Sequence, residues 1–324
     1  MTDPLAAPLK PDRTALVAHA RETIARGSKS FAAASRLFDR TTRERVWLLY
    51  AWCRACDDIA DEQDLGGELG TTPGAAADER LAQIRRLTGL AMAGLPTGNS
   101  NFDALGVVAA ECGLTQAMAN DVIDGFALDA AEWSPRSTAD LLRYCFHVAG
   151  AVGVMMAVVM GVAPDDEDTL DRACDLGIAF QLGNIARDVA EDDRGGRCYL
   201  PSDWLAEAGI PPREHMKPAY RDALLGVARR LAALAAEYEA SARVGASRLA
   251  FRQRWAVLAA AGIYGAIARK VAAGGPDVWD NRIYTTRGEK IRWVLRAGVQ
   301  ALWRPGPAPH PRWSRSSLKA LAAA

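Results

Sequence analysis

Two short acidic segments, far apart in the chain, each place two aspartates four residues apart. The first runs from Asp57 to Asp61 and reads DDIAD, and the second runs from Asp188 to Asp192 and reads DVAED. On a helix, positions i and i+4 share a face, where a pair of like charges is destabilising by roughly 0.2–0.5 kcal/mol. A cation should compensate each pair, so we interpret the two segments as halves of one metal site.

Further polar residues extend both acidic faces along their helices. The first stripe, at positions i, i+4, i+7 and i+11, consists of Tyr50, Arg54, Asp57 and Asp61. The second stripe consists of Gln181, Asn184, Asp188 and Asp192. A single acidic pair is most often a solvated helix end. Two matched stripes within apolar segments instead predict that both faces line a cavity.

The chemistry of these side chains indicates the ligand. Oxygen donors without a histidine or cysteine cluster favour a hard cation, Mg²⁺ or Mn²⁺, and disfavour zinc. Magnesium held by one or two carboxylates keeps coordination positions open for phosphate oxygens. The predicted substrate is therefore an anionic ester, such as a diphosphate bridged by several ions.

Composition and periodicity predict an all-α protein. The 324 residues are 50% hydrophobic and 24% charged, and helical spacing of apolar residues dominates throughout. We expect a flexible N-terminus over 1–15, a single helical domain over 16–300, and a disordered, Pro-rich, basic tail over 301–324. Lysine plus arginine and aspartate plus glutamate each total 39, so nucleic-acid binding is not expected.

Glycine and proline clusters predict the breaks between roughly ten helices. These clusters lie at 66–74, 94–99, 134–135, 161–166, 195–196, 209–212 and 274–276. The first follows the Asp57–Asp61 helix directly and is either a mobile flap beside the site or a plain connector. The uncharged stretch from Tyr144 to Ala163 is long enough to span a bilayer, but its glycines, alanines and His147 favour a buried helix.

The N-terminus has neither the basic nor the apolar region of a secretory signal, so we expect a cytoplasmic protein. The six cysteines are then expected to be thiols. Cys53 and Cys56 form a CxxC pair without a second pair nearby, and we interpret both as packing residues. The basic tail with Trp303 and Trp313 could contact an anionic membrane surface, which adds a membrane-peripheral location to the expectation.

Three segments together resemble the squalene and phytoene synthases, which join two prenyl diphosphates head to head. The first is YAWCR from Tyr50 with the DDIAD that follows it, and the second is YCFHVAGAVG from Tyr144. The third runs from Leu176 through NIARD and ends in RCYLP at Pro201. The SKSF element at Ser28 also resembles the family, so the similarity covers about 27–296. The details are closest to the bacterial phytoene synthases.

The resemblance implies the all-helical isoprenoid synthase fold, with the aspartate motifs on facing walls of a central cavity. The ion ligands that it implies are Asp57, Asp61, Asn184, Asp188 and Asp192. The residues that it implies around diphosphate and prenyl chain are Ser28, Ser30, Tyr50, Arg54, Tyr144, Gln181 and Tyr264. The aspartates, Arg54 and Tyr144 would be catalytic, and Asp58 and Glu191 would lie at the edge. Alternatively, Arg54 bridges to Asp58 and the tyrosines are core aromatics.

The implied reaction joins two geranylgeranyl diphosphates through a cyclopropyl intermediate to give phytoene and diphosphate. Mg²⁺, or Mn²⁺, is the implied cofactor, with no NADPH, and no obligate protein partner is evident. One alternative is a squalene or dehydrosqualene synthase that uses farnesyl diphosphate. A non-catalytic assembly factor should have lost its acidic motifs, and both are intact here. A di-iron bundle needs two Glu-x-x-His motifs, which this sequence lacks.

Overall fold

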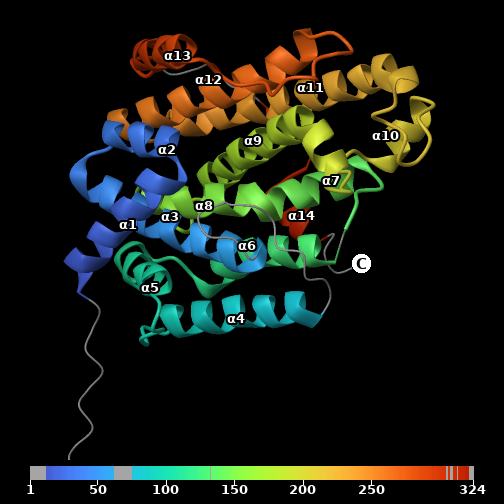
Figure 1. The fold of residues 1–324 in the computed structure, drawn as a ribbon. Coiled ribbons are helices and arrows are strands. Elements are labelled where there is room, and N and C mark those ends of the chain that lie inside the picture. The colour runs from blue at the N-terminus through green and yellow to red at the C-terminus, as the bar shows by residue number, and fades with distance from the viewer. Residues whose placement is uncertain are drawn as a thin grey trace, which may run out of the picture. The chain divides into compact units, whose positions relative to one another are not determined.

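The computed structural model describes residues 12–61, 75–131, 133–303, 306, 309–311 and 313–320. For residues 29, 30, 33, 61, 75 and 76 the backbone alone is described. Helices form all the regular structure of these segments, and no strand occurs among them (Figure 1). The all-α prediction is therefore confirmed. The expected flap at 66–74 and most of the expected flexible N-terminus lie outside the described residues.

The chain divides into two compact units, residues 1–130 and 131–324. The helices of the first unit are α1 (Arg13–Gly27), α2 (Lys29–Ala34), α3 (Arg40–Asp61), α4 (Ala75–Met92), α5 (Ser100–Cys112) and α6 (Gln116–Ala130). A single 3-10 turn, η1 (Ser35–Leu37), follows α2. The predicted break at 94–99 separates α4 from α5, where the Asn99 side chain caps the new helix by accepting from the Asn101 backbone N–H.

Helix α3 has an apolar face that is buried within the first unit. Leu48 and Trp52 are fully buried, and the Trp52 indole donates to the hydroxyl of Thr88 on α4 at 3.2 Å. Helix α5 adds the buried Phe102 and Leu105 to this core, and it packs against α1, α3 and α4. Burial of this face fixes the rotation of α3 about its axis, which determines where its polar stripe points.

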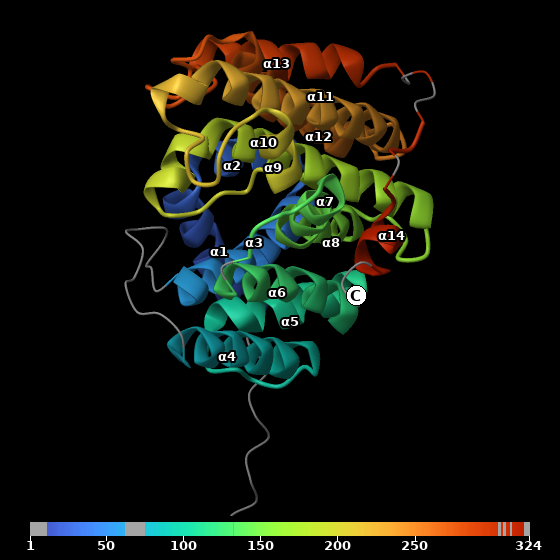
Figure 2. The same ribbon diagram turned by 90° about the vertical axis from the view of Figure 1, so that its right-hand side faces the viewer.

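The second unit contains the longest helices. Its elements are α7 (Thr138–Cys145), the π-helical turn η2 (Phe146–Gly150), α8 (Ala151–Val159), α9 (Glu167–Arg194), α10 (Ser202–Glu207), the 3-10 turn η3 (Pro218–Tyr220), α11 (Arg221–Ala246), α12 (Phe251–Ala273), α13 (Arg287–Gln300) and α14 (Arg315–Ala320). Helix α9 packs against α8, α11 and α12, and α13 lies over α11 and α12 on the side away from α9 (Figure 2). The breaks predicted from glycine and proline agree with the ends of α8, α9, α10 and α12.

Glycines allow α9 to approach the preceding helical segment closely. A Cβ atom added at Gly177 would lie 2.2 Å from the carbonyl oxygen of Ala149, and one added at Gly153 would lie 2.5 Å from that of Ala173. Any larger side chain would push the two backbones apart. The glycines of the second and third family-like segments are therefore packing contacts that hold α8 and η2 against α9.

Two helical stretches are long and apolar enough to cross a membrane by length and composition, Thr138–Val159 and Phe251–Ala273. The buried share of the most apolar window of 18 residues is 67% in the first stretch and 50% in the second. Both stretches pack among other helices of the second unit. Burial of this kind is what core helices show. The first stretch contains most of the 144–163 segment, for which the sequence predicts a buried helix.

Within the segment 301–324, for which the sequence predicts a disordered tail, residues 315–320 form the helix α14. Arg315 is largely buried and pairs with Glu167 and with Asp171, the latter at 2.9 Å. Leu318 is fully buried. Two ion pairs of Arg315 and the buried side chain of Leu318 hold this helix in place. The local composition does not reveal these contacts, because the acidic partners lie far away in the sequence.

Candidate functional site

The first aspartate motif lies at the C-terminal end of α3, where the structure describes Asp57 and Asp58 and the backbone of Asp61. Asp57 is about half exposed, with a side-chain exposure of 46%. Arg54 donates from Nε to Asp58 at 2.9 Å, approaches the same carboxylate with Nη2, and lies 3.8 Å from Asp57. The alternative role of Arg54, an ion pair with Asp58, is therefore present. Asp58 therefore contacts Arg54 directly, and its place at the edge of the site stays a prediction.

The serine-containing segment between α1 and α2 packs against the polar stripe of α3. The Tyr50 hydroxyl lies so close to Gly27 that an added Cβ would be 2.5 Å from it. The rings of Phe31 and Tyr50 are in contact, with centroids 5.6 Å apart. Ser28 follows α1 and accepts a hydrogen bond from the Phe31 backbone N–H at 3.3 Å. Ser28, Tyr50 and Arg54 are thus brought together, whereas the side chain of Ser30 lies outside the described residues.

The second aspartate motif lies in the C-terminal half of α9. Asn184 and Gln181 lie on one face of the helix, with the Asn184 amide 3.5 Å from the Gln181 oxygen. The Arg187 guanidinium binds Asp188, with Nε donating at 2.6 Å. Burial by itself would lower the pKa of Arg187, but the hydrogen bond to Asp188 and the nearby acidic charges outweigh it and raise that pKa.

Asp192 is the most strongly perturbed group of this motif. Burial, followed by the negative charge of Asp188, raises the pKa of its carboxyl to about 7, while Arg197 opposes the shift. A carboxyl group that is buried and close to another carboxylate resists ionisation. Asp192 is also the backbone anchor of the loop that follows α9, because its carbonyl accepts from the Arg197 N–H at 2.8 Å.

Tyr144 joins this loop through an aromatic stack. Its ring stacks on Tyr199, with ring centroids 4.8 Å apart, and on Trp133, with ring centroids 5.6 Å apart. Tyr199 belongs to the same RCYLP segment as Arg197. The second and third family-like segments therefore meet in space within the second unit, and the Tyr144 ring is only 4% exposed.

Tyr264 reaches the same helix from α12. Its ring stacks on Phe180 at 4.6 Å, and its hydroxyl is close enough to Arg187 for that charge to oppose the rise that burial causes in the Tyr264 pKa. This places Tyr264 beside the second aspartate motif, and its role around the diphosphate and prenyl chain stays a prediction.

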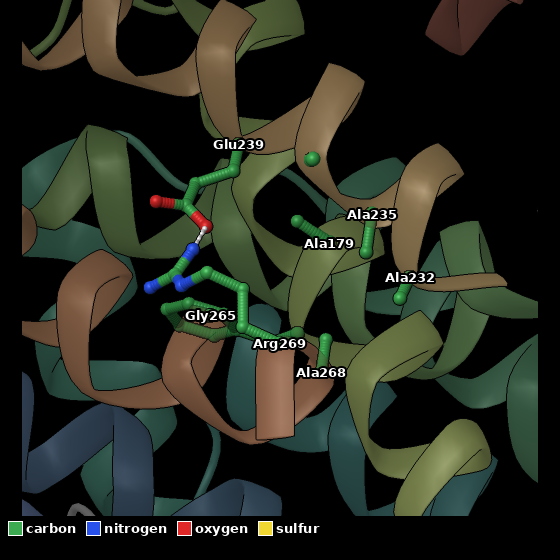
Figure 3. Close-up of a pocket in the computed structure, with 9 residues that line it drawn as sticks. Ala179, Ala232, Ala235, Glu239, Gly265, Ala268 and Arg269 are labelled. Atoms are coloured by element: carbon green, nitrogen blue, oxygen red, sulfur yellow. Dashed lines mark hydrogen bonds and ion pairs between the residues drawn. The ribbon is translucent and has the colours of Figure 1, made fainter. Parts of the chain in front are cut away.

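A small pocket opens next to Phe180, between α9, α11 and α12 (Figure 3). Alanines line most of it, and the ion pair between Glu239 and Arg269, at 3.0 Å, forms one side. A Cβ at Gly265 would lie 2.1 Å from the Glu239 carboxylate, so this glycine leaves room for the pair. The charges of the pocket are already paired with each other, and none of its lining residues belongs to either aspartate motif.

The donor set of the two motifs fits a hard divalent cation. Asp57, Asp188 and Asp192 offer carboxylate oxygens, and Asn184 offers an amide oxygen. Among the described residues, no group of three or more His, Cys, Asp or Glu side chains is arranged to share one ion. The two motifs belong to different units, so their assignment to one site stays a prediction.

Two arginines near the second motif were not predicted as site residues. Arg187 is part of the NIARD motif but received no role from the sequence, although its position directly before Asp188 is compatible with an ion pair. Arg282 comes from the loop before α13, lies 3.8 Å from Asp188, and binds Glu191 at 2.8 Å. No local pattern links Arg282 to α9, because 91 residues separate it from Glu191. Arg282 therefore links Glu191 to Asp188, and the place of Glu191 at the edge of the site stays a prediction.

The cysteines agree with the sequence-based expectation. All six are free, and Cys56, Cys145 and Cys174 are buried. Burial raises the pKa of the Cys53 and Cys56 thiols, which disfavours the thiolate that redox or metal chemistry would need.

Comparison with known proteins gives a consistent result. The family model described as squalene/phytoene synthase matches residues 24–289. The phytoene synthase of Pseudescherichia vulneris is 45% identical over 304 residues, which cover 93% of this chain and 98% of the relative. The 15-cis-phytoene synthase of Pantoea ananas shows the same identity and the same coverage.

Among solved structures, a dehydrosqualene synthase in complex with a ligand superposes with a TM-score of 0.77 at 25% identity. The match covers 89% of this chain and 96% of that structure. The fold is therefore the all-α isoprenoid synthase fold, as the sequence resemblance implied.

Proposed function

The chain belongs to the squalene/phytoene synthase family, and we propose that it is a phytoene synthase, which condenses two geranylgeranyl diphosphates head to head. The observation that carries this assignment is the 45% identity to bacterial phytoene synthases over nearly the whole length of both chains. The protein is a prenyltransferase and acts on a prenyl diphosphate.

The reaction begins when one substrate loses diphosphate and leaves an allylic cation. The double bond of the second substrate attacks this cation, and loss of a proton closes a cyclopropane. The cyclopropyl diphosphate then ionises in turn, rearranges to the 1–1′ linkage, and loses a second proton to give phytoene. Each stage releases one diphosphate, and the electrons balance without a reductant, so NADPH is not part of the proposal.

Residues of the first unit suit the binding of diphosphate. We assign Arg54 to the phosphate oxygens, because a guanidinium stays charged and donates two parallel hydrogen bonds. Asp58 holds that guanidinium in place. Ser28 and Tyr50 lie beside it and offer hydroxyl groups, and Ser30 is assigned to the same role from the sequence.

Residues of the second unit suit the shielding of the cation. We assign this role to the aromatic cluster of Tyr144 and Tyr199 and to the pair of Tyr264 with Phe180, because a ring contributes roughly 0.5–2 kcal/mol to a cation over its face. Gln181 and Asn184 add polar groups on the same face of α9. These rings also exclude water, which would otherwise trap the cation.

We assign the binding of Mg²⁺ to Asp57, Asp61, Asn184, Asp188 and Asp192. Mg²⁺ would neutralise the charge of the departing diphosphate, and Mn²⁺ would serve with the same oxygen donors. Support comes from the donor chemistry, because these residues offer oxygen ligands of the kind that Mg²⁺ prefers. A cytoplasmic location also belongs to the proposal, supported by six free cysteines.

Product analysis tests the assignment of substrate. The purified protein is incubated with Mg²⁺ and either geranylgeranyl or farnesyl diphosphate, without NADPH, and the hydrocarbons are separated by chromatography. We expect phytoene from the C20 substrate. Consumption of the C15 substrate, with no phytoene from the C20 substrate, would show instead a dehydrosqualene-type synthase. No turnover of either substrate would favour a non-catalytic relative.

Matched aspartate variants test the site. Asp57→Asn and Asp188→Asn should each nearly abolish turnover and leave the helical circular dichroism spectrum unchanged. Asp124→Asn is the control for Asp57, because Asp124 has almost the same exposure, 45%, and also pairs with an arginine. Asp140→Asn serves Asp188 in the same way, with exposures of 22% and 20%. Full activity in either site variant would remove its motif from the proposed mechanism.

A further inference from the structure

Helix α13 carries a continuous apolar stripe on its outer face. The exposed side chains at positions i, i+4 and i+8 are Ile291, Leu295 and Val299, which are 62%, 65% and 55% exposed. Leu302 and Trp303, which follow the helix, are 66% and 63% exposed, and Tyr284 before it is 67% exposed. Scattered exposed apolar residues are common on protein surfaces, but a row along one helix face marks an interaction site.

The opposite face of α13 is already occupied. Ala297 and Ala301 are buried in a cluster with Leu258 and Ala259 of α12. The Trp255 indole donates to the carbonyl of Val294 at 2.8 Å, which locks the two helices together. The helix cannot rotate to hide its outer stripe without losing this inner packing. Figure 2 shows α13 as the outermost layer of its unit.

Positive charge borders the stripe on both sides. On the helical projection Arg287 lies along one edge, and Arg292 and Arg296 lie along the other, and all three are exposed. Four cationic residues and one acidic residue, Glu289, occur within α13. The carboxylate of Glu289 is already engaged by Thr286 and Lys270, so it does not neutralise the outer face.

We propose that this face of α13 docks the protein onto an anionic membrane surface. The apolar side chains would enter the boundary between headgroups and acyl chains, and the bordering arginines would contact lipid phosphates. Tyr284 and Trp303 stand at the two ends of the stripe, and amphipathic aromatic rings of this kind favour the membrane interface. A second copy of the chain is a poor occupant, because its own arginines would face these arginines.

This inference goes beyond the proposed function and does not depend on it. It has a chemical consequence for that function, since a C40 hydrocarbon leaves water for a bilayer. Vesicle binding requires no substrate, and turnover can be measured on substrate dispersed in detergent. The two proposals can therefore fail separately.

Vesicle flotation with the full-length protein tests the inference. Wild-type protein should float with vesicles of phosphatidylglycerol and phosphatidylcholine, float less with phosphatidylcholine alone, and release as salt is raised. Leu295→Glu should abolish flotation. Leu95→Glu is the matched control, because Leu95 is also an exposed leucine, 50% exposed, but lies in the first unit. The triple variant Arg287→Gln, Arg292→Gln, Arg296→Gln should bind anionic vesicles roughly 100-fold more weakly.

All substituted side chains are exposed, so circular dichroism and the melting temperature should match those of the wild type. Equal flotation of the Leu295→Glu and Leu95→Glu variants would overturn the proposal. Failure of the wild-type protein to float with anionic vesicles would overturn it as well. Light scattering measures the oligomeric state and so tests whether a second copy of the chain occupies this face. A wild-type dimer that Leu295→Glu dissociates, without any vesicle binding, would assign the face to a second copy and refute the membrane assignment.

Discussion

Asp175 on α9 should make the stability of the protein depend on pH in an unusual direction. The side chain is only 5% exposed, and burial raises the pKa of its carboxyl from 3.8 to about 7. A hydrogen bond donated by the Ser241 hydroxyl at 2.5 Å opposes the shift without cancelling it. The folded protein therefore keeps this group protonated at pH values where the unfolded chain has already ionised it.

The sign and size of the effect follow from the two pKa values. Below about pH 4 the group is protonated in both states, so it contributes no pH dependence. As the pH rises to about 7 the unfolded chain loses this proton first, and the free energy of unfolding falls. Each pH unit between the two values is worth about 1.4 kcal/mol, so the total loss is up to ~4 kcal/mol. Above about pH 7 the curve levels off.

Asp175→Asn should remove this dependence, because the amide stays neutral and can still accept the Ser241 hydrogen bond. Urea unfolding followed by tryptophan fluorescence, at several pH values from 4 to 8, gives the difference between wild type and variant. We expect the variant to gain up to ~4 kcal/mol relative to the wild type across this range.

A control on the same helix should behave in the opposite way. Asp166 caps α9 by accepting from the backbone N–H of Thr169, and hydrogen bonds from the side chain and the backbone of Thr169 lower the pKa of its carboxyl. Its carboxylate therefore raises the free energy of unfolding above the pKa of the unfolded chain, and this contribution is lost as the pH falls. The stability difference between wild type and Asp166→Asn should therefore become smaller in acid. A difference between wild type and Asp175→Asn that stays constant within about 1 kcal/mol from pH 4 to 8 would refute the reasoning.

Three further predictions concern packing, the metal and the C-terminal helix. Gly177→Ala should lower the free energy of unfolding by roughly 1–3 kcal/mol, because its Cβ would meet the Ala149 carbonyl. Gly226→Ala on α11 has open space around it and should raise the free energy of unfolding by about 0.5–1 kcal/mol. Thermal melting compares the two variants. Chelation with EDTA should stop turnover and excess Mg²⁺ should restore it, while activity that survives exhaustive chelation would contradict the assigned ion ligands. Arg315→Gln should speed amide hydrogen exchange in residues 315–320 and leave exchange in α13 unchanged, because Arg315 ties α14 to Glu167 and Asp171.

Much of the fold was predictable because helices depend on neighbouring residues. Apolar spacing within a few turns predicted an all-α chain, and glycine and proline clusters placed the breaks after α8, α9, α10 and α12. Short elements escaped this reasoning. The π-helical turn at Phe146–Gly150 and the six-residue α14 are shorter than the window that a helical period needs.

The site shows the same division. The i, i+4 spacing is enough to put Asp188 and Asp192 on one face of α9, since both residues belong to one helix. The arginine partners of these acids were decided by tertiary structure. Arg282 reaches Glu191 from the loop before α13, across 91 residues of sequence.

The sequence by itself determined the residue types, their helical faces and the family of this protein, because periodicity and motif order are properties of the chain. Only the tertiary structure decided that Arg54 is paired with Asp58, that Tyr144 stacks on Tyr199, and that α13 exposes an apolar stripe. The physical reason is the same in each case. A side chain's position on its own helix is local, whereas its partner depends on how the helices pack.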